Sequence, residues 1–215
     1  MGVAVADDSI PSRRTYRGAS TEERRAARRR RLLDSALELY GTVGFANVSI
    51  QALCSHSGVT ARHLYEEFDS RDEVLESLHD QIVAEVAELV VAALATVPAD
   101  DPDTMSEAGL RAFYSSMLGD PRRARITMIE VMGLPAEKAV ACVDRFGAII
   151  EAYAAELDRA GLIHLESVHL TAVMLAGAVR QLVIDWLMAP KRASIDLLVS
   201  VSTDLFSRLG GYPVT

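Results

Sequence analysis

The sequence predicts an all-α fold with a group of short helices near the N-terminus and a larger helical bundle behind it. Three observations indicate this fold. Apolar residues recur at helical spacing over most of the chain, Pro, Gly and capping residues divide that pattern into segments, and no alternating strand pattern is long enough to count. The 215 residues are 50% hydrophobic with a mean hydropathy of +0.16, which excludes collagen-like, low-complexity and wholly disordered chains.

The first helix is predicted to begin after Ser20, because Ser20 and Glu23 fit a capping box, and to end near Gly41 and Gly44. Apolar residues at helical spacing fill its second half, so this half is expected to face a core. The helix is long enough to support shorter neighbours.

Two short helices are expected next, one at about 50–56 capped by Ser49 and one at about 60–68 capped by Thr60. The turn between them needs Gly58, since a residue with a side chain is strained at positive φ. Helices this short are not stable alone. Packed on the first helix, they predict a helix-turn-helix, whose second helix enters the DNA major groove. Its expected core consists of Leu33, Leu37, Phe45, Val48, Ile50, Leu53, Val59, Leu64 and Phe68.

The rest of the chain is expected to form a helical bundle. Ser70 and Glu73 fit another capping box, which opens a long helix through about Ala95. Further helices are expected near 104–118, 121–132, 135–160, 166–189 and 193–209. The predicted domains are a flexible basic arm at 1–19, a three-helix helix-turn-helix domain at 20–69 and a C-terminal helical-bundle domain at 70–215.

Positive charge is concentrated at one end of an acidic chain. The net charge is −8, but residues 1–71 carry +2 and residues 72–215 carry −10. Nine arginines lie between positions 13 and 31. This balance favours a polyanion partner met by one end of the molecule, with a solvated tail as the alternative interpretation. Arg28 is a candidate contact, although Arg28 to Arg31 span a full helical turn and cannot all face DNA.

The second short helix carries the candidate base contacts. Arg62 can contact guanine O6 and N7 with two guanidinium N–H groups, and His63 can donate to a base or a phosphate. The helix start and the Thr60 hydroxyl suit a phosphate. The Tyr65 hydroxyl can donate to a phosphate oxygen, with a buried core aromatic as the alternative.

Four runs in this region occur in a definite order and spacing: Phe45-Ala46-Asn47-Val48-Ser49-Ile50, Gly58-Val59-Thr60, Leu64-Tyr65-Glu66-Glu67-Phe68 and Ser70-Arg71-Asp72-Glu73-Val74-Leu75. Together they resemble the N-terminal DNA-binding domain of the TetR family of transcriptional regulators. About fifty-five residues carry the resemblance, roughly a quarter of the chain. The remaining residues resemble the family only in length and helical character.

The resemblance implies a homodimer whose heads read a palindromic operator, and a C-terminal domain that binds a small molecule and releases DNA. It places Thr60 and Tyr65 at phosphate contacts, and Arg71 where the family usually has a phosphate-binding lysine. Glu67 replaces a common histidine and Ala61 a common lysine, which predicts a less adhesive recognition helix. The candidate DNA-binding residues are Ser49, Thr60, Ala61, Arg62, His63, Tyr65, Arg71 and Arg28.

No enzyme chemistry is predicted, because the sequence contains no GxSxG, HExxH, Walker A or GxGxxG pattern. No catalytic residue, cofactor or metal is therefore expected. Cys54 and Cys142 cannot form a CxxC site or a disulfide framework, and a cytoplasmic location is the simplest. His164 and His169 are five residues apart, which is a poor spacing for a metal pair on a helix.

The segment 166–209 is the expected dimer interface. Its first helix is apolar nearly all round between Leu170 and Val179, so it must be covered on both sides. Arg180 and Asp185 interrupt the apolar run, which argues against a membrane span. Two copies are predicted to form a four-helix interface, with a monomeric thick core as the alternative.

A ligand pocket is expected in the middle of the C-terminal domain, with core packing as the alternative role for each residue. Methionines adapt to irregular ligands and Tyr153 can orient a polar group, so a mostly apolar effector is predicted. The candidate ligand-binding residues are Phe113, Met117, Met128, Met132, Tyr153 and Met174.

The sequence thus predicts a dimeric, ligand-responsive transcriptional regulator, a repressor, bound to double-stranded DNA. The alternative is a helical small-molecule-binding or sequestering protein without specific operator reading. Glu66, Glu67 and the missing lysine motivate that alternative.

Overall fold

A computed structural model describes residues 20–209, so the basic arm predicted at 1–19 lies outside the described residues. Within the described range every regular element is a helix, as the sequence predicts. The elements are α1 (Thr21–Thr42), η1 (Phe45–Asn47), α2 (Ile50–Ser57), α3 (Ala61–Tyr65), α4 (Arg71–Leu94), α5 (Pro102–Gly119), α6 (Pro121–Met128), η2 (Glu130–Gly133), α7 (Ala136–Arg159), α8 (Val168–Met188) and α9 (Ile195–Leu209).

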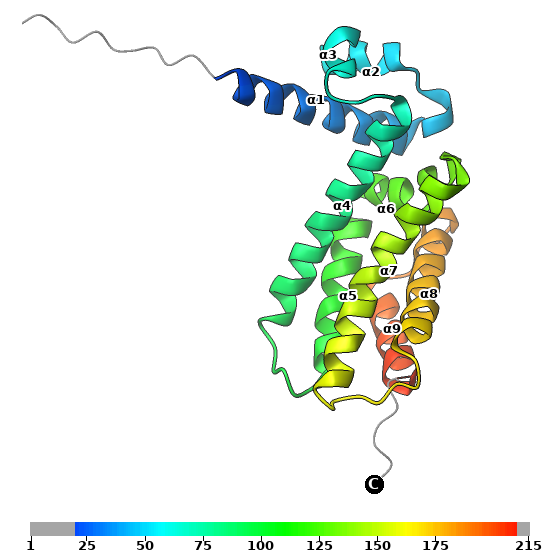
Figure 1. Ribbon diagram of the computed structural model, residues 1–215. Helices are drawn as coiled ribbons and strands as arrows, with labels where there is room; N and C mark the ends of the chain where they lie inside the picture. The colour runs from blue at the N-terminus through cyan, green and yellow to red at the C-terminus, as the bar shows by residue number, and fades with distance from the viewer. Residues whose placement is uncertain (1–19, 210–215) are drawn as a thin grey trace, which may run out of the picture.

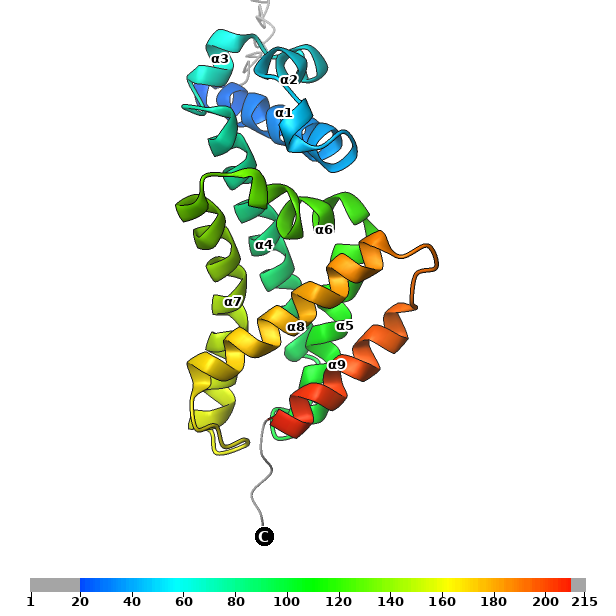
Figure 2. The same cartoon turned by 90° about the vertical axis from the view of Figure 1, so that its right-hand side faces the viewer.

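The three N-terminal helices form a head at one end of an elongated body (Figure 1). α4 leaves the head and runs down the body beside α5. Figure 2 shows α8 and α9 on the face of the body turned toward the viewer, and α9 packs chiefly on α5. One continuous hydrophobic core joins head and body, so the two parts are packed together rather than linked by an exposed tether.

The predicted helix starts are confirmed by their hydrogen bonds. Ser20 and Glu23 form the reciprocal capping box of α1. The Ser49 hydroxyl accepts from the Ala52 amide at 3.1 Å, and the Thr60 hydroxyl accepts from the His63 amide at 3.4 Å. These caps satisfy amides that a short helix leaves without an internal partner.

The core predicted for the head is confirmed, with Leu37 and Ile50 half-buried at its edge and the other seven residues buried. Gly58 adopts the left-handed conformation (φ 65°, ψ 25°) that the turn requires. α3 is shorter than predicted and ends at Tyr65 instead of Phe68. The chain turns there because Phe68 must enter the core and its amide bonds back to the Leu64 carbonyl at 2.9 Å.

One other boundary differs from the prediction. The helix expected at 121–132 is broken at Ile129 into α6 and η2. The end of α1 is confirmed, since α1 ends at Thr42, between Gly41 and Gly44. Gly41 is buried, and a Cβ there would meet the Cβ of Arg122 at 2.5 Å. The remaining helices of the body begin and end within two residues of the predicted positions.

The break at Ile129 allows η2 to contact the head. Glu130 accepts hydrogen bonds from the Phe45 amide at 2.7 Å and from Arg125 Nε at 2.8 Å. Arg125 also donates to the Thr42 carbonyl at 3.0 Å, and Arg122 forms an ion pair with Glu38. We call these contacts between α1 or η1 and α6 or η2 the head–body latch.

Candidate functional site

The N-terminal half of α3 is exposed at the outer end of the head, away from the body (Figure 1). Tyr65 is 55% exposed, and the Arg62 side chain is 87% exposed. Thr60 and Ala61 are exposed beside them, while His63 is half-buried. A nucleic-acid backbone can therefore reach these residues, and the alternative of a core role for Tyr65 is wrong.

Short local contacts hold the unbound side chains of α3. Arg62 Nε donates to Glu66 at 3.2 Å, which is an exposed pair one helical turn apart. Such pairs contribute little to stability, so a base or a phosphate can displace Glu66 from Arg62. His63 Nδ1 lies 3.0 Å from the Thr60 hydroxyl, which orients the imidazole across the helix start.

Glu67 has a structural role that its place in the sequence does not reveal. Its carboxylate is only 3% exposed and accepts from Arg25 Nε at 2.9 and 3.0 Å. The expectation that Glu67 makes the recognition helix less adhesive is wrong, because this carboxylate faces α1 and is neutralised there. Ala61 remains as the departure that lowers positive charge on the exposed face, where Glu66 also places a carboxylate.

Two further arginines brace the head from inside. The Arg29 guanidinium lies 4.4 Å from the centre of the Phe68 ring and donates to the Glu67 carbonyl and the Ser77 hydroxyl. The Arg71 guanidinium lies 4.2 Å from the centre of the Phe45 ring and donates to the Val48 carbonyl at 2.9 Å. Cations over aromatic rings add to stability when partly desolvated.

The other predicted DNA contacts, Ser49, Arg28 and Arg71, differ in their exposure and in whether protein groups already hold them. Ser49 is exposed at the start of α2, where its hydroxyl is already used as a cap. Arg28 is half-buried, and its Nε atom has no hydrogen-bond partner among the described residues. The phosphate contacts expected of Arg71 and Arg28 stay predictions, and Arg71 is held by protein groups in this structure.

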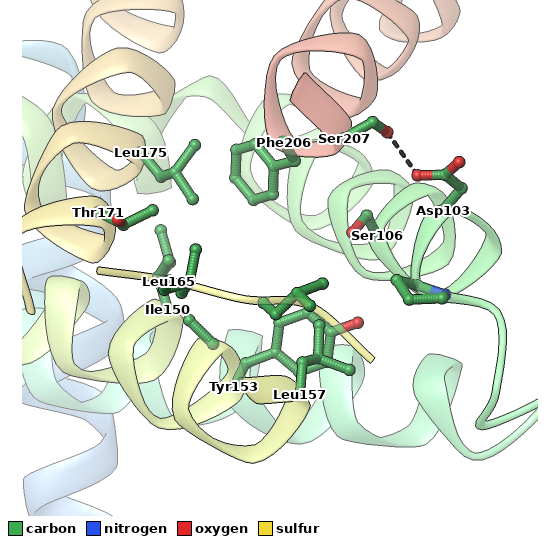
Figure 3. A pocket seen from close by; sticks show the side chains of 13 residues that line it. Asp103, Ser106, Ile150, Tyr153, Leu157, Leu165, Thr171, Leu175, Phe206 and Ser207 are labelled. Carbon is green, nitrogen blue, oxygen red and sulfur yellow. Dashed lines mark hydrogen bonds between the residues drawn. The ribbon is translucent and has the colours of Figure 1, made fainter. Parts of the chain in front are cut away.

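The body contains two adjoining cavities between α5, α7 and α9. The first has about 560 Å³ of empty space and the second about 600 Å³, both including space open to solvent. Figure 3 shows the first cavity, with Asp103, Ser106 and Ser207 on one side and Leu165, Thr171 and Leu175 on the other. The second extends toward α4. The two cavities share the lining residues Ser106, Ile150, Tyr153 and Phe206.

Tyr153 lies at the junction of the two cavities. Its hydroxyl oxygen is buried, and no described residue gives it a hydrogen bond of good geometry. Burial raises the pKa of Tyr153 to about 12, and the nearby Ser106 hydroxyl opposes that shift. Tyr153 is therefore neutral at physiological pH and able to donate a hydrogen bond to a ligand.

The helices of the head match a known protein family. Residues 32–78 match the family model described as "Bacterial regulatory proteins, tetR family". The matched range holds the second half of α1, all of α2 and α3 and the start of α4. The head is therefore a TetR-type helix-turn-helix, and it stands on an all-α body. A comparison with curated protein sequences finds no match.

Solved TetR-type structures share the fold over most of the chain. FadR from Bacillus halodurans superimposes with a TM-score of 0.73 at 18% identity over 86% of this chain and 96% of its own. FadR from Bacillus subtilis, solved with stearoyl-CoA, gives 0.73 at 18% identity over 85% and 98%. PfmR from Thermus thermophilus gives 0.60 at 20% identity over 84% and 98%. The similarity covers head and body together.

The six candidate ligand-binding residues stay predictions, and two of them line a cavity. Tyr153 lines both cavities and Phe113 lines the second. Met117 and Met128 are buried in the core but line neither cavity. The side chains of Met132 and Met174 are 54% and 55% exposed and line neither cavity. Met132 lies outside the core because the helix breaks at Ile129. Met174 lies on the outward face of α8, and the sequence cannot tell this face from the inward one because both are apolar.

Other lining residues escaped the sequence prediction. The sequence pattern places Asp103 in a loop and Phe206 in the apolar stripe of the dimer face, whereas both line the first cavity. Ser106 and Thr171 interrupt apolar helical faces, and this interruption is the sequence signal that could have revealed them. The sequence does not say which of the body's apolar faces enclose space, because that depends on how the helices diverge.

The surface of α8 and α9 exposes a group of large apolar side chains that the protomer leaves uncovered: Leu170, Val173, Met174, Met188, Leu197 and Val201. Among the described helices, α8 is also the one with the length and composition to cross a bilayer. A helix that two protein layers cover has the same composition. Within the protomer α8 packs on α6 and α7, and Arg180 donates to the Met128 carbonyl at 2.8 Å.

Proposed function

We propose that this TetR-family regulator binds double-stranded DNA through the start of α3 and responds to a ligand held in the two cavities of the body. The exposure of Arg62 and Tyr65 at the outer end of the head is the observation that carries the proposal. Thr60 and Tyr65 contact phosphates, and Arg62 and His63 contact bases. Phosphate contacts supply affinity, and base contacts supply sequence preference.

The operator is a palindrome bound by a homodimer, and the regulator acts as a repressor in the cytoplasm. Support for the dimer comes from the uncovered apolar side chains on α8 and α9, which lie in the segment 166–209. A two-fold dimer presents two heads to half-sites about 34–36 Å apart. If a second copy covers these side chains, the apolar composition of α8 is explained without a membrane.

The effector is an elongated, mostly apolar molecule that spans both cavities. Aliphatic and aromatic side chains dominate the lining, and Tyr153 supplies a polar group at the junction. The FadR of Bacillus subtilis was solved with stearoyl-CoA, a ligand with a long apolar chain. The two heads of the dimer can be spaced either to fit the operator or not to fit it. A ligand changes the affinity for DNA only to the extent that it binds more tightly to one of these arrangements than to the other.

Mobility-shift titrations on a site selected from random DNA test the proposal. Arg62→Ala should weaken binding to that site by about 1–3 kcal/mol and relax preference at one position. Tyr65→Phe should weaken selected and random DNA alike, because it removes a phosphate contact. Arg159→Ala, which removes an exposed cation at the far end of α7, is the matched charge control and should change neither affinity.

The alternative function, ligand sequestration without operator reading, gives a different result. Arg62→Ala would then reduce the affinity for selected and random DNA equally, and no sequence would be enriched from the pool. Glu66 beside Arg62 is the residue that favours this alternative.

A further inference from the structure

Tyr153 of α7 lines both cavities, so its side chain lies between two spaces instead of at the end of one. Its hydroxyl points toward the side of the first cavity that holds Ser106 (Figure 3). From this junction the first cavity extends to Thr171 and Leu175 of α8, and the second extends to Val90 of α4. A ligand atom held at Tyr153 therefore has space for apolar chain on two sides.

Two hydroxyl groups are the polar side-chain groups of this junction. The residues that line both cavities are Ser106, Ile150, Tyr153 and Phe206, and two of these are wholly apolar. The rest of the described lining of the second cavity is also apolar. A ligand can thus form hydrogen bonds with Ser106 and Tyr153 at the junction, whereas the part of it that enters the second cavity has to be apolar.

The Tyr153 hydroxyl is suited to donate a hydrogen bond. Burial raises the pKa of Tyr153 to about 12, so the hydroxyl keeps its proton at physiological pH. The neighbouring Ser106 hydroxyl opposes this shift, as a group does that can donate to the tyrosine oxygen. No described residue accepts a hydrogen bond of good geometry from Tyr153. A buried donor without an acceptor is unfavourable, and a ligand that brings an acceptor removes this cost.

We infer that the effector carries an uncharged oxygen acceptor inside its apolar skeleton, as an internal ketone or an ester does, and that Tyr153 donates to this oxygen. The skeleton then continues into both cavities. A fatty acid or a long-chain amine fits this arrangement less well, because its polar head ends the chain and leaves one of the two spaces without apolar contact. The inference deepens the proposed function, since it rests on the two cavities being the effector site.

Calorimetric titration of the full chain with two isomeric ketones, each below its solubility limit, tests the position of the acceptor. Dipentyl ketone and methyl nonyl ketone consist of the same atoms, but the carbonyl lies in the middle of the first chain and near the end of the second. Dipentyl ketone should bind at least about fivefold more tightly, because both of its arms are buried while its carbonyl meets Tyr153. Equal affinities, or tighter binding of methyl nonyl ketone, would overturn the inference.

Tyr153→Phe tests the donor, because it removes the hydroxyl and keeps the ring. The affinity for dipentyl ketone should fall about fivefold with the loss of one hydrogen bond. Butylbenzene, which has no acceptor, should bind the variant at least as tightly as the wild-type chain, so a general disturbance of the site would be recognised. An unchanged affinity for dipentyl ketone in Tyr153→Phe would contradict the assigned contact.

Tyr40→Phe is the matched control. The Tyr40 hydroxyl is also buried without a hydrogen-bond partner among the described residues, but it lies in the head and lines neither cavity. Its removal should leave the affinities for both ketones unchanged. A loss as large as that in Tyr153→Phe would show that the effect does not come from the junction.

Gly109→Leu tests whether the ligand occupies both spaces. Gly109 lines the second cavity, and a Cβ there meets Val90 and Leu94 at ordinary contact distances, so a longer side chain takes space from one arm of the ligand. The variant should weaken dipentyl ketone more than methyl nonyl ketone and so abolish the preference between the isomers. A preference that survives in a folded Gly109→Leu chain would contradict a ligand that spans the junction.

Mobility shifts on the selected DNA keep the two proposals distinguishable. If the chain enriches no DNA sequence while the calorimetric preference holds and is lost in Tyr153→Phe, the proposed regulatory function fails and the ligand class stands. If specific DNA is bound and the two ketones bind equally, the ligand class fails and the regulatory function stands.

Discussion

Arginines on α1 divide into two groups by the direction of their side chains. Arg25 and Arg29 reach Glu67, Ser77 and the Phe68 ring, and so hold the end of α3 and the start of α4. The second group consists of the exposed residues Arg24, Arg30 and Arg31, and the half-buried Arg28 belongs to neither group. The inward group explains how a glutamate can stand at position 67 in a DNA-binding head without facing the DNA.

Arg25→Ala should lower the free energy of unfolding by about 1–3 kcal/mol, because it leaves the Glu67 carboxylate buried without its cation. Arg24→Ala removes the same charge from an exposed neighbour, so it should change stability by less than about 0.5 kcal/mol. Urea denaturation of both variants measures the difference. Equal effects would mean that the Arg25–Glu67 ion pair contributes no more to stability than an exposed charge does.

His79 on α4 is a buried imidazole that makes stability depend on pH. Burial lowers its pKa, and the hydrogen bond to Asp80 opposes that shift. The folded protein therefore binds this proton less readily than the unfolded chain, and the stabilising effect is present above about pH 6.5 and is lost as pH falls below it.

The unfolding free energy of the wild-type chain should thus decrease between pH 7.5 and pH 5.5, roughly the range in which an unperturbed histidine gains its proton. His79→Gln should flatten this part of the profile, whereas His164→Gln, at an exposed histidine, should retain it. Denaturant titrations at the two pH values are the measurement. A wild-type slope that survives in His79→Gln would assign the pH dependence to another group.

Single residues were predictable where the physics is local. Ser20, Ser49, Thr60 and Gly58 follow from cap and turn chemistry that involves a few neighbouring positions. The partner of Glu67 was not predictable, because Arg25 lies 42 positions away and its side-chain direction depends on how α1 crosses α3.

At the scale of elements, the break between α6 and η2 allows the hydrogen bonds of the head–body latch. With α6 ending at Met128, Glu130 reaches the Phe45 amide and Arg125 reaches the Thr42 carbonyl. The sequence predicted one helix over 121–132, because its pattern contains no breaker until Gly133. The interruption comes from these long-range hydrogen bonds.

Glu130→Ala should loosen the head while leaving the body folded. It leaves the Phe45 amide and Arg125 Nε without their acceptor, at a cost of about 1–3 kcal/mol. Trp186, the single tryptophan, lies in α8 and reports on the body alone, whereas circular dichroism reports on all helices. The two urea transitions should coincide in the wild-type chain and separate in Glu130→Ala. Coincident transitions in the variant would show that the latch is not needed for cooperativity.

For the whole molecule, the two-part layout followed from the sequence, because its helix boundaries are marked by Pro, Gly and capping residues. The cavities did not follow, since enclosed space depends on the angles between α5, α7 and α9. The sequence pattern of α8 predicted a helix covered on two sides. In the structure α6 and α7 cover one side, and apolar side chains on the other side are exposed.

Val173→Glu should break the proposed dimer. Val173 is 54% exposed on α8, so a charge there costs the protomer little but would be buried without a partner between two copies. Val140→Glu, at a 58% exposed valine of α7 outside the segment 166–209, is the matched control. Sedimentation velocity at micromolar concentration should give a dimer for the wild-type chain and the control, and a 23.3 kDa species for Val173→Glu. A wild-type chain that sediments at 23.3 kDa would contradict the dimer.

The unbroken course of α4 gives the molecule a lever arm. Its first turns pack in the head through Val74 and Leu75, and its last turns supply Val86, Val90 and Leu94 to the wall of the second cavity. Twenty-four residues at 1.5 Å per residue make a rod of about 36 Å. A tilt of about 5° at the cavity end would displace the other end by roughly 3 Å. In the proposed dimer, a ligand in the cavities could thereby alter the spacing of the two heads without unfolding any part of the chain.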